Sequence, residues 1–208
     1  DRRRSGGSAP AAARAENAAP RDAVTYSACY TVVPTYECFN KCAYCSFRAP
    51  IAGGRGDWKS KDDVRADLER VAASGVCEVL VLAGEVRFDS PKRSAWHAMM
   101  VDACEAALEL DLLPHTNVGP LLEAEMVALA EVNASMGLML EQATPALRLP
   151  GAPHHRAPSK DPALRMEQLD MAGRLRVPFT TGILCGIGET ADDRLRSLDV
   201  IAESHARH

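Results

Sequence analysis

The sequence predicts an α/β protein built as a partial (β/α) TIM-like barrel, truncated after about five strand–helix units. Short apolar runs alternate with amphipathic segments from residue 24 to the end, which indicates a parallel sheet covered by helices. The run at 77–84 is almost entirely aliphatic, as expected of a strand covered on both faces. Polar residues follow these runs, at the strand ends where barrels of this type hold their reactive groups.

Five apolar runs are predicted as strands, at 30–35, 77–84, 113–118, 133–140 and 179–186. Parallel strands of one sheet are joined by right-handed crossovers, and each gap between the runs leaves room for one. No sixth run follows. We therefore expect one core domain over residues 24–208 that is incomplete at its C-terminal side and leaves its last strand as an open edge.

Helix start signals lie between the predicted strands. Ser60 and Asp63 have the spacing of a capping box ahead of an apolar stripe, and Gly75 provides a stop. Thr190 and Asp193 repeat the capping pattern for a last helix. The side chains expected on the buried faces of the first and last helices are Val64, Leu68, Val71, Ala72, Leu195, Leu198 and Ala202.

Three further helices are expected between these two. One covers about 95–110, one begins at Pro120, and one begins at Pro162 with Asp161 as its cap. The side chains expected on the buried faces of the first two are Trp96, Met100, Ala103, Ala107, Leu122, Met126 and Leu129.

Composition excludes several classes of protein. Hydrophobic residues make up 47% and charged residues 25%, as in globular proteins. No apolar run approaches the roughly 20 residues of a membrane helix. The net charge of −4 and the lack of a basic face suggest neither nucleic acid nor an anionic membrane as a partner. Seven cysteines, three of them clustered, favour a reducing compartment and a metal centre over disulfides.

Residues 1–23 differ in composition from the rest of the chain. They are rich in Ala, Arg, Ser, Gly and Pro, so we expect a disordered extension. Either it is the remnant of a transit peptide, which would place the protein in a plastid, or it is a plain extension of a cytoplasmic protein.

The stretch TYECFNKCAYCSFR places Cys38, Cys42 and Cys45 on one short loop. Three thiolates at this spacing can hold one face of an iron–sulfur cluster and leave one iron open. Zinc is the alternative, but a structural zinc site takes four protein ligands, and the nearest downstream histidine is the distant His97.

With Tyr44 before the last cysteine, the loop reads C-x-x-x-C-x-aromatic-C and resembles the radical S-adenosylmethionine (radical SAM) enzymes. The resemblance implies a barrel of the radical SAM type. It also implies a 4Fe-4S cluster whose open iron is chelated by S-adenosyl-L-methionine. An electron donor would reduce the cluster, and cleavage of the cofactor would release a 5′-deoxyadenosyl radical.

The same resemblance assigns further cofactor-binding residues. Ala83, Gly84 and Glu85 stand where the family has Gly-Gly-Glu, whose carbonyl oxygens accept from the cofactor's ammonium, and Gly84 would permit close approach. Tyr44 is also assigned as a cofactor-binding residue by this resemblance. Glu141 is expected either to bind the ribose or methionyl part of the cofactor or to be a solvated loop acid.

A glycine-rich segment follows the fifth predicted strand. Gly182, Leu184, Gly186 and Glu189 match the family's G-x-I-x-G-x-x-E pattern with Leu for Ile. The resemblance implies that this segment lines the adenine of the cofactor. Without the cysteine loop ahead of it, such a glycine-rich turn would indicate little.

Other polar residues have less specific interpretations. His115, Thr116 and Asn117 cluster where the barrel mouth is expected, so His115 and Asn117 are the candidates for catalytic contact. The loop after the fourth predicted strand is either a lid over the site or a mobile basic loop without a role. Its polar residues are His154, His155, Arg156, Ser159 and Lys160.

The remaining sulfur-containing residues are interpreted as packing. Cys77, Cys104 and Cys185 are expected to be small buried hydrophobes, whereas Cys29 has no clear assignment. The methionines expected in the core are Met99, Met100, Met136, Met139, Met166 and Met171.

The segments VPTYECFNKCAYC, SMGLMLEQ and APSK resemble the 7,8-didemethyl-8-hydroxy-5-deazariboflavin synthases in particular. This resemblance implies a lyase that closes the deazaflavin ring of a tyrosine–ribityldiaminouracil adduct and releases ammonia. A companion radical SAM subunit or fused domain would supply the adduct. Two alternatives stay open: a truncated, non-catalytic iron–sulfur or zinc module, and a related radical SAM enzyme with another substrate.

Overall fold

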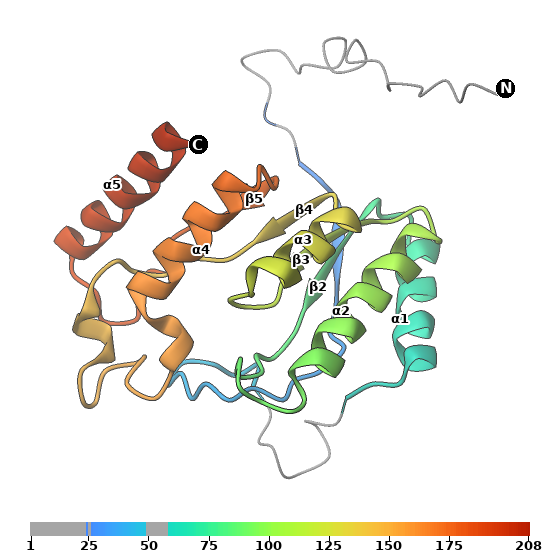
Figure 1. Ribbon diagram of the computed structural model, residues 1–208, viewed down its shortest axis with the longest axis horizontal. Coiled ribbons are helices and arrows are strands. Elements are labelled where there is room, and N and C mark those ends of the chain that lie inside the picture. The colour runs from blue at the N-terminus through green and yellow to red at the C-terminus, as the bar shows by residue number, and fades with distance from the viewer. Residues whose placement is uncertain (1–23, 25, 49–57) are drawn as a thin grey trace, which may run out of the picture.

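A computed structural model of the chain describes residues 24, 26–48 and 58–208. These residues form a parallel sheet of five strands in the order β1-β2-β3-β4-β5, with helices between successive strands (Figure 1). The predicted partial α/β barrel of five strand–helix units is thereby confirmed. The predicted extension at 1–23 lies outside the described residues.

The strands are shorter than the predicted apolar runs. The strands are β1 (Cys29–Val32), β2 (Glu78–Leu82), β3 (Leu113–Asn117), β4 (Ser135–Gly137) and β5 (Phe179–Thr180). The helices are α1 (Lys61–Ala73), α2 (Arg93–Leu108), α3 (Glu123–Glu131), α4 (Pro162–Arg174) and α5 (Ala191–Arg207), with 3-10 turns η2 (Pro145–Arg148) and η3 (Pro158–Lys160). The predicted strands were too long because Leu138 and Leu140 are buried by packing after β4 has ended.

The capping signals are confirmed at three helix starts. Ser60 and Thr190 each form a capping box with the acid three residues on. Asp161 accepts a hydrogen bond from the Ala163 amide, and Pro162 is the first residue of α4. Each side chain satisfies backbone donors that a helix leaves unpaired at its start.

The predicted start of α3 was wrong. Pro120 lies ahead of the helix, which begins at Glu123. Leu122 is therefore the capping residue and is 48% exposed instead of lying on the buried stripe, whereas Met126 and Leu129 are buried as predicted. The Glu125 carboxylate caps this end by accepting from the Leu122 amide at 2.8 Å.

The main core lies between the helices and one face of the sheet. Val79 and Val81 of β2 are fully buried, as are Leu68 of α1 and Trp96 and Met100 of α2. Because strand side chains alternate between faces, residues 80, 82, 115 and 117 lie on the other face, the inner face of the curved sheet. That face carries the site described below.

Several predictions about sulfur-containing residues were wrong. Cys104 is buried, but Cys77 and Cys185 are exposed, because Cys77 precedes β2 and Cys185 lies well past the short β5. Met166 is 37% exposed because it lies on the outer face of α4. The unassigned Cys29 is also exposed.

The last helix, α5, has the fewest buried residues of the described α-helices. Leu195 and Leu198, predicted to be buried, are 62% and 50% exposed, and among the described strands β5 pairs only with β4. Val200 and Ile201 do pack against a small cluster of Leu140, Ala143 and Leu169. None of the described helices has the length and apolar character that spanning a membrane requires.

The cap of α4 provides a test of this account of the helix starts. We expect Asp161→Ala to lower the free energy of unfolding by about 1 kcal/mol, because the Ala163 amide loses its acceptor. Asp161→Asn is the matched control: it removes the charge paired with Arg148 but keeps a capping side chain. Urea denaturation measures both, and equal losses in the two variants would contradict the capping role.

Candidate functional site

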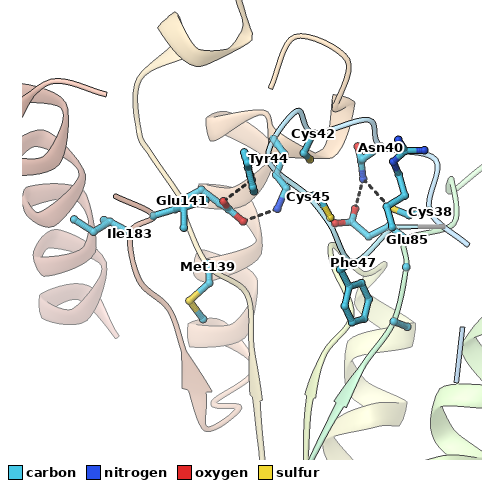
Figure 2. Close-up of a pocket in the computed structure, with 15 residues that line it drawn as sticks. Cys38, Asn40, Cys42, Tyr44, Cys45, Phe47, Glu85, Met139, Glu141 and Ile183 are labelled. Atoms are coloured by element: carbon cyan, nitrogen blue, oxygen red, sulfur yellow. Dashed lines mark hydrogen bonds and ion pairs between the residues drawn. The ribbon is translucent and has the colours of Figure 1, made fainter. Parts of the chain in front are cut away.

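The cysteine loop follows β1 and forms one wall of a cavity of about 330 Å³ at the carboxyl ends of the strands. Cys38, Cys42 and Cys45 all line this cavity (Figure 2). The opposite wall is formed by Glu141 and Ile183, which follow β4 and β5. The fold thus brings the three predicted thiols to the end of the sheet where a barrel holds its site.

Backbone hydrogen bonds fix the cysteine loop in place. The Phe39 amide donates to the Glu85 carbonyl oxygen at 3.1 Å. The Lys41 and Ala43 amides donate to the carbonyl oxygens of Arg156 and Pro153, at 2.8 and 2.9 Å. The segment 153–160 is therefore packed against the cysteine loop, and its interpretation as a mobile basic loop without a role was wrong.

Asn40 holds three parts of the site together, and the sequence interpretation missed it. Its side-chain amide donates to the Glu85 carboxylate at 3.0 Å and to the Ser159 hydroxyl at 2.7 Å, and it lies 3.8 Å from the Cys38 sulfur. The Asn40 side-chain oxygen, Oδ1, accepts a hydrogen bond from the Ser159 backbone amide. The available signal was its position, two residues after a predicted cluster ligand.

Two of the thiols, those of Cys38 and Cys42, resist ionisation in the protein alone. Burial and the Glu85 charge raise the pKa of Cys38. Burial raises the pKa of Cys42 to about 11, although the Lys160 ammonium opposes the shift. A metal centre binds thiolates, so its positive charge would have to offset this cost.

The donor set fits an iron–sulfur cluster. Three thiols line one cavity wall, which is the ligand type and number that leave one iron of a 4Fe-4S cluster open. Among the described residues, no three His, Cys, Asp or Glu side chains are close enough to hold a single ion. In a cluster each thiolate binds a different iron, so the thiols need not meet at one point. His97, considered for zinc, instead lies 3.0 Å from the Glu125 carbonyl oxygen.

Glu141 is a buried carboxylate at the centre of a polar network. It accepts from the Tyr44 hydroxyl at 3.0 Å (Figure 2) and from the Lys160 ammonium at 2.5 Å. The Arg165 guanidinium lies 3.8 Å away. Burial opposes the ionisation of Glu141, but Lys160 and Arg165 outweigh that effect and lower its pKa. It is thus an ionised carboxylate with 8% exposure, which corrects the alternative of a solvated loop acid.

The backbone at Glu141 is unusual. Its φ of 67° lies in the left-handed region that side chains other than glycine rarely adopt. An isolated bridge to Ile183 holds it there, with the Leu184 amide donating to the Glu141 carbonyl oxygen at 2.9 Å. This bridge directs Ile183 and Leu184 into the cavity wall after β5 has ended.

His154 is a neutral member of the same network. The single hydrogen of the Tyr44 hydroxyl goes to Glu141, so the His154 Nε2, 2.9 Å from the Tyr44 oxygen, carries a hydrogen and donates it. Burial lowers the His154 pKa from 6.5 to about 4, although Glu141 opposes the shift.

His154 therefore adds a pH dependence to stability. Below pH 6.5 the unfolded chain binds a proton at this residue that the folded chain does not bind, so stability is lost as the pH falls from 6.5 toward 4. We expect His154→Gln to remove this component, so that the variant loses less unfolding free energy than the wild type over that range. Chemical denaturation at stepped pH measures the difference, and parallel curves would contradict it.

Gly84 is required by the cysteine loop itself. A Cβ at this position would lie 2.1 Å from the Glu37 carbonyl oxygen, and the Gly84 amide donates to the Thr35 carbonyl oxygen at 2.9 Å. The close approach predicted at this glycine is therefore to the chain's own backbone. Ala83, Gly84 and Glu85 nevertheless all line the cavity.

We expect Gly84→Ala to displace the cysteine loop and to lower the unfolding free energy by about 1–3 kcal/mol, because the added methyl group overlaps fixed backbone. Gly182→Ala is the control for folding, since its Cβ would meet only the flexible Met139 sulfur at 3.3 Å. Urea denaturation compares the two variants. A Gly84→Ala protein as stable as Gly182→Ala would contradict the packing role.

The two candidate catalytic residues lie apart from the thiols. His115 and Asn117 are within β3, not in the loop after it. The His115 Nδ1 lies 2.6 Å from the Ser135 hydroxyl, and among the described residues His115 lines none of the cavities found near the cysteine loop. Asn117 lines a second, adjoining cavity. Thr116 is buried on the helix-covered face, so its expected place at the barrel mouth was wrong.

The glycine-rich segment only partly reaches the site. Leu184 lines the first cavity, whereas Gly186 has a φ of 86° and faces open space, since a Cβ added there would meet no atom within 4 Å. Glu189 accepts from the Gly186 and Ile187 amides at 2.7 and 2.9 Å, which lowers its pKa to about 2. In this structure Glu189 therefore holds the turn.

Comparison with known proteins gives relatives by sequence and by fold. Residues 32–201 match the family model described as the Radical SAM superfamily. A curated protein of Synechococcus elongatus named 7,8-didemethyl-8-hydroxy-5-deazariboflavin synthase is 54% identical over 184 residues, which are 88% of this chain and 54% of the relative. One of the same name from Gloeobacter violaceus is 52% identical over 89% of this chain and 56% of the relative. The chain spans about half the length of these relatives.

Solved structures of lower identity share the fold. The FeFe-hydrogenase maturase HydG from Carboxydothermus hydrogenoformans has a TM-score of 0.69 at 18% identity, covering 86% of this chain and 40% of that chain. Methylornithine synthase (PylB) has a TM-score of 0.67 at 17% identity, covering 85% and 50%. At these identities the likeness concerns the fold alone.

Proposed function

The chain belongs to the radical SAM superfamily, and we propose that it is the radical-generating part of a 7,8-didemethyl-8-hydroxy-5-deazariboflavin synthase. The observation that carries the proposal is the 54% identity to a curated protein of that name, joined with three thiols around one cavity. Because the chain spans about half of such relatives, the activity of the whole protein is part of the proposal.

Cys38, Cys42 and Cys45 would hold a 4Fe-4S cluster with one iron free for S-adenosyl-L-methionine. When bound, the reduced cluster and cofactor supply a 5′-deoxyadenosyl radical that takes a hydrogen atom from the substrate. The wall residues Ala83, Gly84, Glu85 and Glu141 would contact the cofactor. An external electron donor would reduce the cluster.

The chain's own residues set the electrostatics of this cavity. Asn40 orients the Glu85 carboxylate beside Cys38, and Lys160 and Tyr44 orient Glu141. Fixed groups of this kind need not reorganise when a charged ligand binds. Lys160 also brings a positive charge toward Cys42, which favours the thiolate that a cluster needs.

The substrate would be a tyrosine–ribityldiaminouracil adduct made by a companion radical SAM subunit or a fused domain. The proposed reaction joins the phenol ring to the uracil and releases ammonia, which makes the enzyme a lyase. The second candidate is a non-catalytic iron–sulfur module, which is favoured by the exposed Leu195 and Leu198 and by the short β5.

The test is a product assay on the anaerobically reconstituted chain. With reductant, S-adenosyl-L-methionine and the adduct, we expect 5′-deoxyadenosine and a fluorescent deazaflavin in equal amounts. Cofactor cleavage without deazaflavin would contradict the substrate assignment. Cluster loading without 5′-deoxyadenosine would instead favour the binding module.

A further inference from the structure

A second cavity of about 180 Å³ adjoins the one lined by the thiols. The two share six lining residues, which are Phe47, Ala83, Glu85, Met139, Glu141 and Lys160. The second cavity extends along the inner face of the sheet, where Asn117 of β3 and Arg165 of α4 line it. Cavities for drug-sized ligands measure about 300–1,000 Å³, so this one has room for a single ring.

Arg165 lines this cavity with a donor that has no hydrogen-bond partner. The side chain is 2% exposed. Its Nε donates to the Ser159 carbonyl oxygen at 2.9 Å and its Nη1 to the Met139 carbonyl oxygen at 2.5 Å. Its Nη2 lies 3.6 Å from the Glu85 carboxylate, which is an ion-pair contact and too long for a hydrogen bond.

An unpaired buried donor of this kind calls for an explanation. Most buried polar atoms in proteins are hydrogen-bonded, and leaving one unpaired costs free energy. Each of the other two Arg165 nitrogens donates to one backbone oxygen, which fixes the guanidinium plane. The free Nη2 is therefore a positioned donor at the cavity wall.

Asn117 offers a second polar group to the same cavity. It lies at the carboxyl end of β3, opposite Leu82 of β2. Among the residues that the structure describes, none hydrogen-bonds to its side-chain amide, although it is only partly exposed. An amide can donate and accept at once, so with Arg165 it could bind a group that carries both a carbonyl oxygen and an N–H.

The fixed charges around the cavity are balanced. Lys160 and Arg165 contribute two positive charges, and Glu85 and Glu141 contribute two negative ones. An added anion or cation would upset this balance in a largely buried space, whereas a neutral polar ring would not. Phe47 and Leu138 supply apolar walls for the faces of such a ring.

We propose that this second cavity is the substrate subsite and receives the uracil ring, with Arg165 Nη2 donating to a ring carbonyl oxygen and Asn117 pairing with the adjacent carbonyl and N–H edge. The inference rests on the proposed function. It adds that the uracil part of the substrate is bound, and that the second cavity binds it. Arg165 and Asn117 are binding residues in this scheme, and neither takes part in proton transfer.

The experiment is calorimetric titration of the cluster-loaded protein, saturated with S-adenosyl-L-methionine, using 6-(ribitylamino)uracil as the probe. We expect the wild type to bind the probe and Asn117→Leu, of nearly equal size, to bind about fivefold more weakly. The affinity of Arg165→Gln for the probe should be lower by at least about tenfold, because a charged donor is lost. Arg174→Gln, an exposed change on the same helix, should bind as the wild type does.

Thermal unfolding shows which variants are folded. If Arg165→Gln is unfolded, the affinity of Asn117→Leu for the probe tests the subsite. Equal affinity of Asn117→Leu and wild type would overturn the subsite, as would the absence of probe binding to the wild type. Displacement of the probe by L-tyrosine would also overturn it, because tyrosine has no ureide edge. If the variants weaken probe binding but no deazaflavin forms, the proposed function fails while the subsite stands.

Discussion

Cys42→Ala is expected to abolish both cluster loading and 5′-deoxyadenosine formation. Cys42 is the middle thiol of the three, it is 9% exposed, and it lines the cavity with the other two. With two thiols left, the cluster would have two irons without protein ligands. Iron and sulfide analysis after anaerobic reconstitution should fall to background, and product assays should detect no cofactor cleavage.

Cys77→Ala is the matched control for this change. Cys77 is also a free cysteine, but it is exposed and lies just before β2, at the opposite end of the strand from the cavity. Cluster content and 5′-deoxyadenosine yield should equal those of the wild type. If Cys42→Ala keeps its iron, or if Cys77→Ala loses it, the assignment of the cluster ligands is wrong.

Arg93→Met is expected to have the largest effect on stability. The guanidinium is buried and donates to both oxygens of Glu125, to the Val86 carbonyl oxygen at 2.6 Å and to the Pro120 carbonyl oxygen at 2.9 Å. It also lies over the Trp96 ring, 4.3 Å from the centroid. Removing one partner of a buried ion pair typically costs about 3–5 kcal/mol, against a total stability of about 5–15 kcal/mol.

The physical reason can be separated from simple loss of packing. In Arg93→Met the Glu125 carboxylate is left buried without its cation, so the double variant Arg93→Met with Glu125→Leu should recover part of the lost stability. Arg87→Met, which breaks an exposed pair with Asp89, should give no resolvable change. Urea denaturation of the wild type, the single variants Arg93→Met, Glu125→Leu and Arg87→Met, and the double variant measures this, and a fully additive double variant would contradict the account.

The position of Arg93 links this stability to the site. Val86 follows Glu85, and Pro120 follows Gly119, so one guanidinium joins the loops after β2 and β3. Each of these loops contributes a residue to the cavity walls: Glu85 after β2 and Gly119 after β3. We therefore expect cluster loading of Arg93→Met to fall together with its stability.

Features set by local sequence could be predicted. The cysteine spacing depends on one short segment, and the capping boxes at Ser60 and Thr190 each involve residues three apart. The alternation of apolar runs was enough to predict five parallel strands that alternate with helices. For the cysteine loop and the capping boxes, the signal and the structure that it determines lie within a few residues of one another.

Features set by contacts between distant segments could not be predicted. Asn40 meets Ser159 across 119 residues, and Arg93 meets Glu125 across 32. Neither residue belongs to a recognisable local pattern. The strand ends were missed because Leu138 and Leu140 remain apolar for packing after backbone pairing has ended.

The functional interpretation of Gly84 shows the same limit. The sequence indicated that a side chain is not tolerated there, and the structure shows why: a Cβ would meet the Glu37 carbonyl oxygen. A glycine that serves a ligand and one that serves the chain's own backbone look alike in sequence. Only the position of the neighbouring loop distinguishes them.

The most direct test of the central claim is electron–nuclear double resonance on the reduced, reconstituted chain with S-adenosyl-L-methionine isotopically labelled at its amino nitrogen. If Cys38, Cys42 and Cys45 hold a cluster with one free iron, the labelled nitrogen should couple to the cluster spin. A cluster signal with no coupling to the label, or no paramagnetic cluster at all, would contradict the account.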